Sequence, residues 1–198
     1  MKTFYVVKYE GHFGFIKPWT AVRDGGSPDA IHTFSQQFLT PSIIEGIEKK
    51  LFPELLQEKG ISKIARHKLT YAGFSGQMEQ TQTLGWEYKK AKKMLQRPRS
   101  ILVRGVLLYP NLYLAFDSLD DAQRASVQHI CLCRNEDVLF PTEDILHLTE
   151  EQFGELNGFE LRFGQAPGSF LVGYSRFTNA PMYGWIESTQ NPLKTNGF

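Results

Sequence analysis

The chain has 198 residues, of which 41% are hydrophobic and 22% charged, and its formal net charge is +1. This length predicts one domain, or one domain with a small appendage, that can bury a core without disulfides or metal ions. The composition excludes a collagenous or disordered chain, and no apolar run is long enough to span a bilayer. The polar N-terminus is not typical of a signal peptide. Cys131 and Cys133 are too close in sequence for an unstrained disulfide, so we expect reduced thiols in a cytoplasmic protein.

The first predicted element is a strand over residues 3–9, which are mostly β-branched or aromatic. A long loop over residues 11–39 follows and is rich in glycine and proline. Loops of this length in compact domains are usually functional or disordered. The side chains in it that are suited to contacting a polar ligand are Lys17, Trp19, Arg23, His32, Gln36 and Gln37.

Residues 40–56 have the clearest helical pattern of the chain. One apolar face repeats every four residues, at Ile43, Ile47, Leu51 and Leu55. Ser42 and Glu45 have the spacing of a capping box, and Pro53 is expected to kink or end the helix. Gly46, in the second turn, is interpreted as a point of tight packing between this helix and a sheet.

The middle of the chain predicts strands around a polar excursion. Residues 61–74 and 100–116 have strand character, the latter with a turn at Pro110 and Asn111. The segment between them has no sustained apolar period and predicts either an extended hairpin or a short basic helix. A second helix is predicted over residues 118–130, with Ser118 and Asp121 at capping spacing, followed by a strand.

The resulting order is strand, helix, strand, strand, helix, strand, which is the ferredoxin-like, RRM-like βαββαβ pattern of the α+β class. This pattern is expected to cover residues 1–138. Residues 139–198 contain short strands between glycines and prolines, and predict a small β-rich C-terminal appendage. The fold alone does not define a function, because many unrelated activities use it.

The charges are segregated along the chain. Residues 66–104 contain nine bases and two acids, whereas residues 117–160 contain eleven acids and two bases. A short lysine run is most often a solvated helix face. Here, however, Trp86 and Tyr88 precede the run, and Arg97 and Arg99 follow it. Aromatic side chains beside cations are typical of surfaces that bind single-stranded nucleic acid.

Signatures of common catalytic or cofactor sites are missing from the sequence. It has no P-loop, no G-x-G-x-x-G and no G-x-S-x-G, and we expect no cofactor. The five histidines are far apart, and a row formed by His129, Cys131 and Cys133 would lack a fourth ligand, so we expect no metal and interpret the cysteines as buried structural residues. His67, Lys68 and Tyr71 could be assembled for general acid–base chemistry, but most sequences offer such a trio.

The N-terminal part of the chain resembles the Cas-five family of CRISPR-associated proteins. The resemblance rests on an initial strand with a phenylalanine-rich segment, on Thr40-Pro41-Ser42 followed by Gly46-Ile47 at the first helix, and on the strands over residues 67–74 and 99–116. The segment HICLCRNED is similar to a family motif written L-G-R-x-E, with Cys133 in the place of glycine and with Arg134 and Glu136 retained. The resemblance covers about the first 140 residues.

The resemblance implies a ferredoxin-like palm with a basic thumb hairpin inserted at about residues 75–99. It also implies a non-catalytic subunit of a class 1 CRISPR surveillance complex that holds the 5′ handle of the guide RNA (crRNA). The implied partners are the crRNA, a Cas-seven-type backbone filament that the subunit caps, a large subunit beside it, and target DNA only indirectly. The expected RNA contacts are Lys17, Trp19, Arg23, Gln36, Gln37, Ser42, His67, Lys68, Lys89, Lys90, Lys92, Lys93, Arg97, Arg99 and Arg134.

Three alternatives stay open. For Arg134, an ion pair with Glu136 or Asp137 competes with an RNA contact. One branch of the family cuts precursor RNA without metal, using a tyrosine at the start of the first helix with a lysine–histidine pair. Pro41 or Ser42 stands at that place here, which argues against cleavage. A ferredoxin-like domain that binds a ligand other than RNA would explain the fold but not the basic and aromatic excursion.

Overall fold

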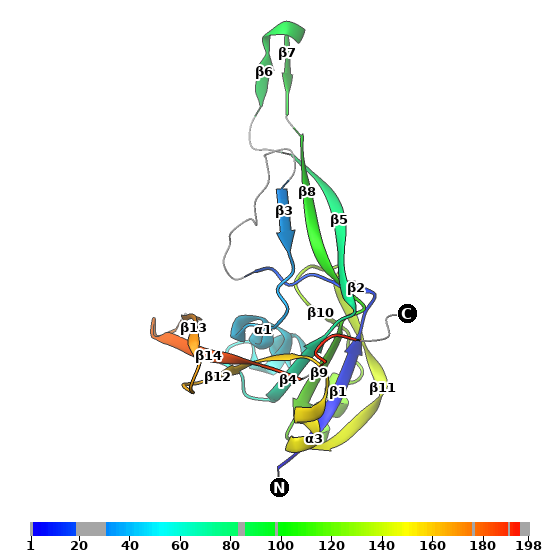
Figure 1. Cartoon of the computed structure of the whole chain (residues 1–198), viewed down its shortest axis with the longest axis vertical. Coiled ribbons are helices and arrows are strands. Elements are labelled where there is room, and N and C mark those ends of the chain that lie inside the picture. Colours follow the sequence, from blue (N-terminus) through cyan, green and yellow to red (C-terminus); the bar gives the residue numbers. More distant parts are fainter. Residues whose placement is uncertain are drawn as a thin grey trace.

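The computed structural model describes residues 2–18, 31–82, 86–97, 99–175, 177–189 and 191–194. It has a sheet with helices against it and a long hairpin that projects away from the sheet (Figure 1). The α-helices are α1 (Pro41–Leu51), α2 (Leu119–Ala125) and α3 (Glu150–Glu155), and the short 3₁₀ helices are η1 (Pro53–Leu55) and η2 (Lys90–Lys92).

The strands of the described residues form three sheets. The largest has the order β10 (Ile130–Cys131), β11 (Val138–Thr149), β1 (Thr3–Glu10), β9 (Asn111–Phe116), β4 (Ile64–Thr70), β12 (Phe159–Phe163), β14 (Pro181–Ser188) and β13 (Phe170–Tyr174). The second contains β2 (Phe13–Gly14), β3 (Ile31–Phe34), β5 (Gly73–Gln82) and β8 (Arg99–Leu108), and the third contains β6 (Glu87–Lys89) and β7 (Met94–Gln96).

The centre of the large sheet is buried on both faces. Val7 and Tyr9 of β1 pack in the main core with residues of α1 and α2, while Phe4 and Val6 pack on the other face against Phe153 of α3. Successive side chains of a strand point to opposite faces, so one strand supplies both cores. The Tyr9 hydroxyl donates to the carbonyl of Ala125, 2.8 Å away, and burial raises the pKa of Tyr9.

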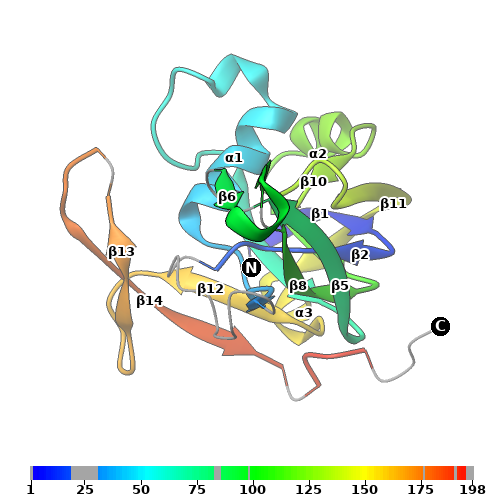
Figure 2. The same ribbon diagram turned by 90° about the horizontal axis from the view of Figure 1, so that it is seen from above.

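The predicted ferredoxin-like βαββαβ palm is wrong. The described residues are predominantly β, and their principal element is the eight-stranded antiparallel sheet. The main cause is the segment after residue 150. Its strands β12, β14 and β13 continue the large sheet beyond β4 and extend it to one side of the molecule (Figure 2).

Gly158 permits this extension. Phe159 of β12 is the partner of Leu69 of β4, and Gly158 has a φ of 139°, a conformation that L side chains rarely adopt. A Cβ on Gly158 would lie 2.7 Å from the carbonyl oxygen of Leu69. The close contact between β4 and β12 therefore requires glycine.

The first helix begins earlier than its predicted capping box. Thr40 is the N-cap and Pro41 is the first helical residue, and no side chain caps this end. The predicted Ser42–Glu45 capping box is therefore wrong, and the Glu45 carboxylate instead accepts from Lys49, 2.6 Å away. The interpretation of Gly46 is also wrong, because a Cβ on it would meet nothing within 4 Å.

Candidate nucleic-acid interface

The segment between β4 and β9 is an extended hairpin rather than a short helix. We call residues Gly73–Leu108 the thumb. Its strands β5 and β8 pair in antiparallel register from Gly73↔Leu108 to Gln82↔Arg99. On the other side of β8, β3 pairs in parallel from Ile31↔Leu102 to Phe34↔Gly105. The thumb projects far beyond the large sheet and ends in the small β6–β7 hairpin (Figure 1).

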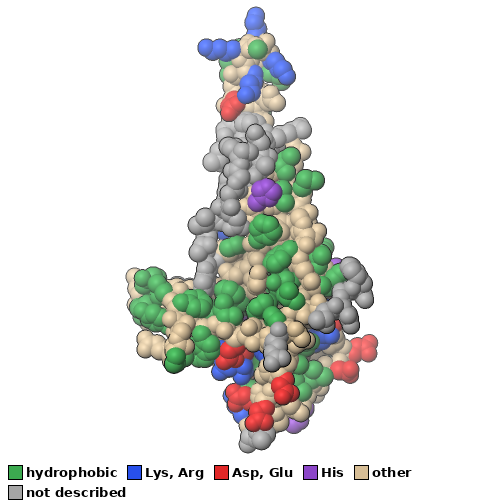
Figure 3. Space-filling model, viewed as in Figure 1, with side chains coloured by type: hydrophobic (Ala, Val, Ile, Leu, Met, Phe, Trp, Pro, Cys, Tyr) green, Lys and Arg blue, Asp and Glu red, His purple; other side chains and the backbone are tan. Residues whose placement is uncertain are grey.

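The thumb tip, residues 86–97, is exposed throughout and carries five bases and one acid. The backbone turns at Lys93, which has a φ of 46°. The four predicted lysines lie together on β6, η2 and the following turn, and they are Lys89, Lys90, Lys92 and Lys93. Lys89 is 2.9 Å from Glu87. Figure 3 shows Lys and Arg side chains gathered in blue at this end of the molecule.

Two aromatic side chains accompany these cations. Trp86 is 64% exposed and Tyr88 is 58% exposed. The guanidinium carbon of Arg97 lies 5.6 Å from the centre of the Trp86 ring, a cation–π distance. Cations and exposed aromatic rings therefore lie together at the tip. Of Arg99, at the start of β8, the structure describes only the backbone.

The predicted palm contacts are placed differently. His67 is 4% exposed, and its Nε2 is a buried atom without a hydrogen-bond partner. Lys68 is also buried, and its Nζ donates to the carbonyls of Gly154 and Leu156. Burial, reinforced by the charges of Arg66 and Arg162, lowers the pKa of His67 to about 3, and burial lowers the pKa of Lys68. The structure therefore places both predicted RNA contacts inside the protein.

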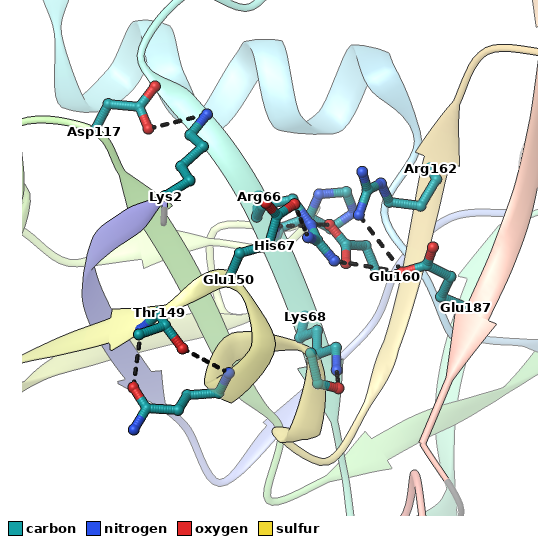
Figure 4. Close-up of polar contacts among 12 residues, drawn as sticks. Lys2, Arg66, His67, Lys68, Asp117, Thr149, Glu150, Glu160, Arg162 and Glu187 are labelled. Carbon is teal, nitrogen blue, oxygen red and sulfur yellow. Dashed lines mark hydrogen bonds and ion pairs between the residues drawn. The ribbon is translucent and has the colours of Figure 1, made fainter.

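An ion-pair cluster centred on the buried Arg66–Glu160 pair lies next to these two residues. Arg66 donates from Nε and Nη2 to the two carboxylate oxygens of Glu160, at 2.7 and 2.6 Å. It also lies 3.4 Å from Glu150 and 3.3 Å from Glu187, which in turn is 3.6 Å from Arg162 (Figure 4). Removing one partner from such a buried pair is strongly destabilising. The cluster holds α3, β4, β12 and β14 together and is structural.

Arg134 forms ion pairs with Asp137 and Glu136, which was the alternative to an RNA contact. Its Nε and Nη2 donate to the carboxylate of Asp137 at 2.9 and 2.6 Å, and Nη1 lies 3.2 Å from Glu136. The hydrogen bond to Asp137 raises the pKa of Arg134. Arg104 is paired in the same way with Glu79, 2.8 Å away.

The other predicted contacts lie near the start of α1 or outside the described residues. Lys17, Gln37 and Ser42 are exposed, and the side-chain amide of Gln36 donates to the carbonyl of Phe38 at 2.8 Å. Trp19 and Arg23 lie outside the described residues.

The cysteines were expected to be buried, and that prediction is wrong. Cys133 is exposed, Cys131 is half-buried, and both are free thiols. Within the described ranges, no cluster of three or more His, Cys, Asp or Glu side chains is arranged to hold a metal ion.

A cavity of about 410 Å³ lies between the first turn of α1 and the β13–β14 hairpin. Pro41, Ser42, Tyr174 and Phe177 are among its lining residues. Sequence reasoning did not anticipate it, because its two walls are more than a hundred residues apart. Among the predicted contacts that the structure describes, Ser42 lines this cavity.

No protein-family model matches the sequence, and no curated protein sequence matches it significantly. None of the helices in the described part of the chain is long and apolar enough to cross a membrane.

Proposed function

We propose that this protein is a non-catalytic crRNA-binding subunit of a class 1 CRISPR surveillance complex, in which it holds the 5′ handle of the crRNA. The observation that carries the proposal is the exposed thumb tip, where Lys90, Lys92 and Lys93 stand beside Trp86 and Arg97 at the end of a projecting hairpin. The sequence resemblance to the Cas-five family supplies the identity of the RNA. The proposal does not depend on a ferredoxin-like palm.

The chemistry of the tip suits a single strand better than a duplex. Lysines neutralise phosphates without reading sequence, and exposed aromatic rings stack on bases that are not already stacked in a helix. A short RNA handle offers both groups at once. The contacts we assign to it are the exposed members of the predicted set: Lys17, Gln37, Ser42, Lys89, Lys90, Lys92, Lys93 and Arg97.

The proposed partners follow from the family resemblance. A Cas-seven-type backbone subunit and a large subunit would lie beside this protein, and target DNA would be met only through the guide RNA. The proposed location is the cytoplasm, without membrane attachment. The acidic surface around α3, with Glu150, Glu151 and Glu155 exposed, repels nucleic acid and would face solvent or a basic partner subunit.

The positions of His67 and Lys68 favour binding over cleavage. A general acid or base must reach the reacting atoms, and here the imidazole is buried while the lysine is held by two carbonyls. A metal-independent endoribonuclease would need other residues. This observation supports the non-catalytic form of the proposal.

One gel experiment tests the proposal. The purified protein is incubated with end-labelled repeat RNA in EDTA, and the products are separated on native and denaturing gels. We expect a shifted complex on the native gel and intact RNA on the denaturing gel. Cleavage would contradict the non-catalytic role, and absence of a shift at low salt would contradict RNA binding. An unrelated RNA of equal length is the control for the handle sequence.

A further inference from the structure

One face of the thumb carries apolar side chains between the large sheet and the tip. Side chains of paired residues lie on the same face of a sheet. The register therefore places Met78 of β5 beside Val103 of β8, and Gln80 beside Ile101. Phe34 of β3 joins the same face through its pairing with Gly105. We call the side chains of Phe34, Phe74, Met78, Ile101 and Val103 the apolar face.

This surface is open to solvent. Phe34 is 51% exposed, Met78 is 79% exposed and Phe74 is 38% exposed, and Ile101 is exposed as well. Apolar side chains are visible along the thumb between the basic tip and the large sheet (Figure 3). Contiguous apolar patches on soluble proteins commonly mark interaction sites.

The opposite face of the thumb is different. It carries the Arg104–Glu79 ion pair, and the Arg104 guanidinium carbon lies 5.3 Å from the centre of the Phe15 ring in the body of the protein. By contrast, the described cross-strand neighbours on the apolar face include no acidic side chain. Gly76, Gly105 and Phe34 are neighbours across β5, β8 and β3, and Met78, Val103 and His32 are the next set of neighbours. A polyanion approaching these described residues would meet no carboxylate among them.

Glycine fixes the aromatic ring on this face. A Cβ on Gly105 would lie 2.2 Å from the Phe34 ring, so glycine lets the ring lie against the strand. The Phe34 and Phe74 rings contact each other edge to face, with centroids 6.1 Å apart. Rings held in this way present area for stacking with little loss of side-chain freedom.

We propose that the apolar face is a stacking surface for unpaired bases of the RNA whose phosphates bind at the thumb tip. This inference rests on the proposed function and deepens it. The lysines of the tip hold the backbone, and the following bases lie along Phe34, Phe74 and Met78. The charge pattern favours RNA over a protein partner as the occupant, because the tip of the same hairpin carries five bases and the described pairs of the face include no acid.

The test measures affinity and its salt dependence by fluorescence anisotropy with a short single-stranded repeat RNA. The variants are Phe34→Ala and Met78→Ala, and Leu56→Ala is the matched control, an exposed apolar side chain next to η1. Because stacking on an aromatic ring contributes about 1–3 kcal/mol per base, we expect Phe34→Ala to bind roughly fivefold to a hundredfold more weakly. Met78→Ala should also bind more weakly, because it removes apolar contact area on the same face. The salt slope should not change, since no phosphate contact is lost.

A second RNA keeps the test independent of folding. The same strand with abasic sites should bind the wild-type protein more weakly than the intact strand does. The affinity of the abasic strand for the Met78→Ala variant should be no lower than its affinity for the wild-type protein. Suppose that the wild-type protein binds the intact and abasic strands equally well, and that the variants bind RNA as the wild type does. The stacking surface is then refuted while the proposed function stands. If the variants instead lose association with another protein at unchanged RNA affinity, the face binds protein. If the wild-type protein binds no RNA, both proposals fail.

Discussion

Glu48 connects the first helix to the strand that follows it. Its side chain is fully buried, and its carboxylate accepts hydrogen bonds from the backbone N–H groups of Ser62, Lys63 and Ile64. These donors precede or begin β4, so one side chain sets the position at which the chain enters the large sheet. The sequence gives no hint of this role, because a glutamate in an amphipathic helix is usually solvated.

Glu48→Ala should therefore be strongly destabilising. The substitution leaves three backbone donors without their acceptor, and a buried unsatisfied donor costs roughly 1–3 kcal/mol. We expect the free energy of unfolding, measured with urea, to fall by about 3 kcal/mol or more. Glu58→Ala, at an exposed position after η1, is the control and should change stability little. Equal stability of the two variants would contradict the assigned role.

His67 should make the protein sensitive to acid. Burial and the charges of Arg66 and Arg162 lower its pKa to about 3 in the folded state, whereas an unfolded chain has a histidine pKa near ~6.5. Between these values the unfolded state binds a proton that the folded state does not bind. The free energy of unfolding therefore falls as the pH decreases from about 6.5 toward 3, by up to ~1.4 kcal/mol per pH unit from this group.

The His67→Phe variant isolates this contribution. Phenylalanine keeps an aromatic ring near Phe163, with which His67 stacks at 6.4 Å, but it cannot bind a proton. Urea unfolding at several pH values between 4 and 7 should show a shallower loss of stability in the variant than in the wild type. The carboxylates titrate in both proteins and cancel in the comparison. Parallel pH profiles would show that His67 is not the responsible group.

At the residue scale, the sequence predicted the tip better than the interior. The lysines of residues 89–93 are exposed because they lie in a polar segment that has no apolar period to bury it. His67 and Lys68 also lie beside a base-rich segment, yet β4 is buried along most of its length. The partners that make this burial possible, among them Glu160, are more than ninety residues away in sequence, which no local pattern can reveal.

At the scale of elements, two glycines should respond oppositely to the same substitution. Gly46 lies on the exposed side of α1 with open space around it, so Gly46→Ala should raise the free energy of unfolding by up to about 1 kcal/mol through helix propensity. Gly158→Ala should lower it, because the new Cβ would meet the carbonyl of Leu69. Thermal unfolding of both variants is the measurement. A destabilised Gly46→Ala protein would restore the interpretation of tight packing.

The elements themselves were predicted unevenly. The strand over residues 3–9 and the helix in residues 40–56 correspond to β1 and α1, because their periodicity is strong. The excursion before residue 100 was left open between hairpin and helix because its sequence has no sustained apolar period, so the alternation that identifies a strand is missing. The capping box of α3, formed by Thr149 and Gln152, was missed although its spacing is recognisable.

At the scale of the whole molecule, the prediction of the fold class was wrong because of the C-terminal third of the chain. Short strands between glycines were read as a separate appendage, but β12 pairs with β4 and thereby extends the central sheet. An edge strand with unpaired backbone groups recruits another strand if one is within reach. Which strand does so depends on three-dimensional proximity, and the βαββαβ order gave no information about it.

The formal net charge of +1 conceals an uneven distribution of charge over the molecule. Bases gather at the thumb tip, and acids gather near the other end, around α3 (Figure 3). This separation would direct an RNA strand toward the tip and away from the large sheet. The central claim, that the tip lysines bind phosphates, therefore predicts a specific dependence of affinity on salt.

The most direct test is the slope of log affinity against log salt concentration for a single-stranded repeat RNA. Replacing Lys90, Lys92 and Lys93 by alanine should weaken binding and reduce the magnitude of the slope by about 2, since each lost phosphate contact contributes roughly 0.7 for a single strand. A control that replaces the exposed lysines Lys2, Lys50 and Lys59 removes the same charge and should leave the slope nearly unchanged. Equal slopes for the wild-type protein and the tip variant would contradict the account.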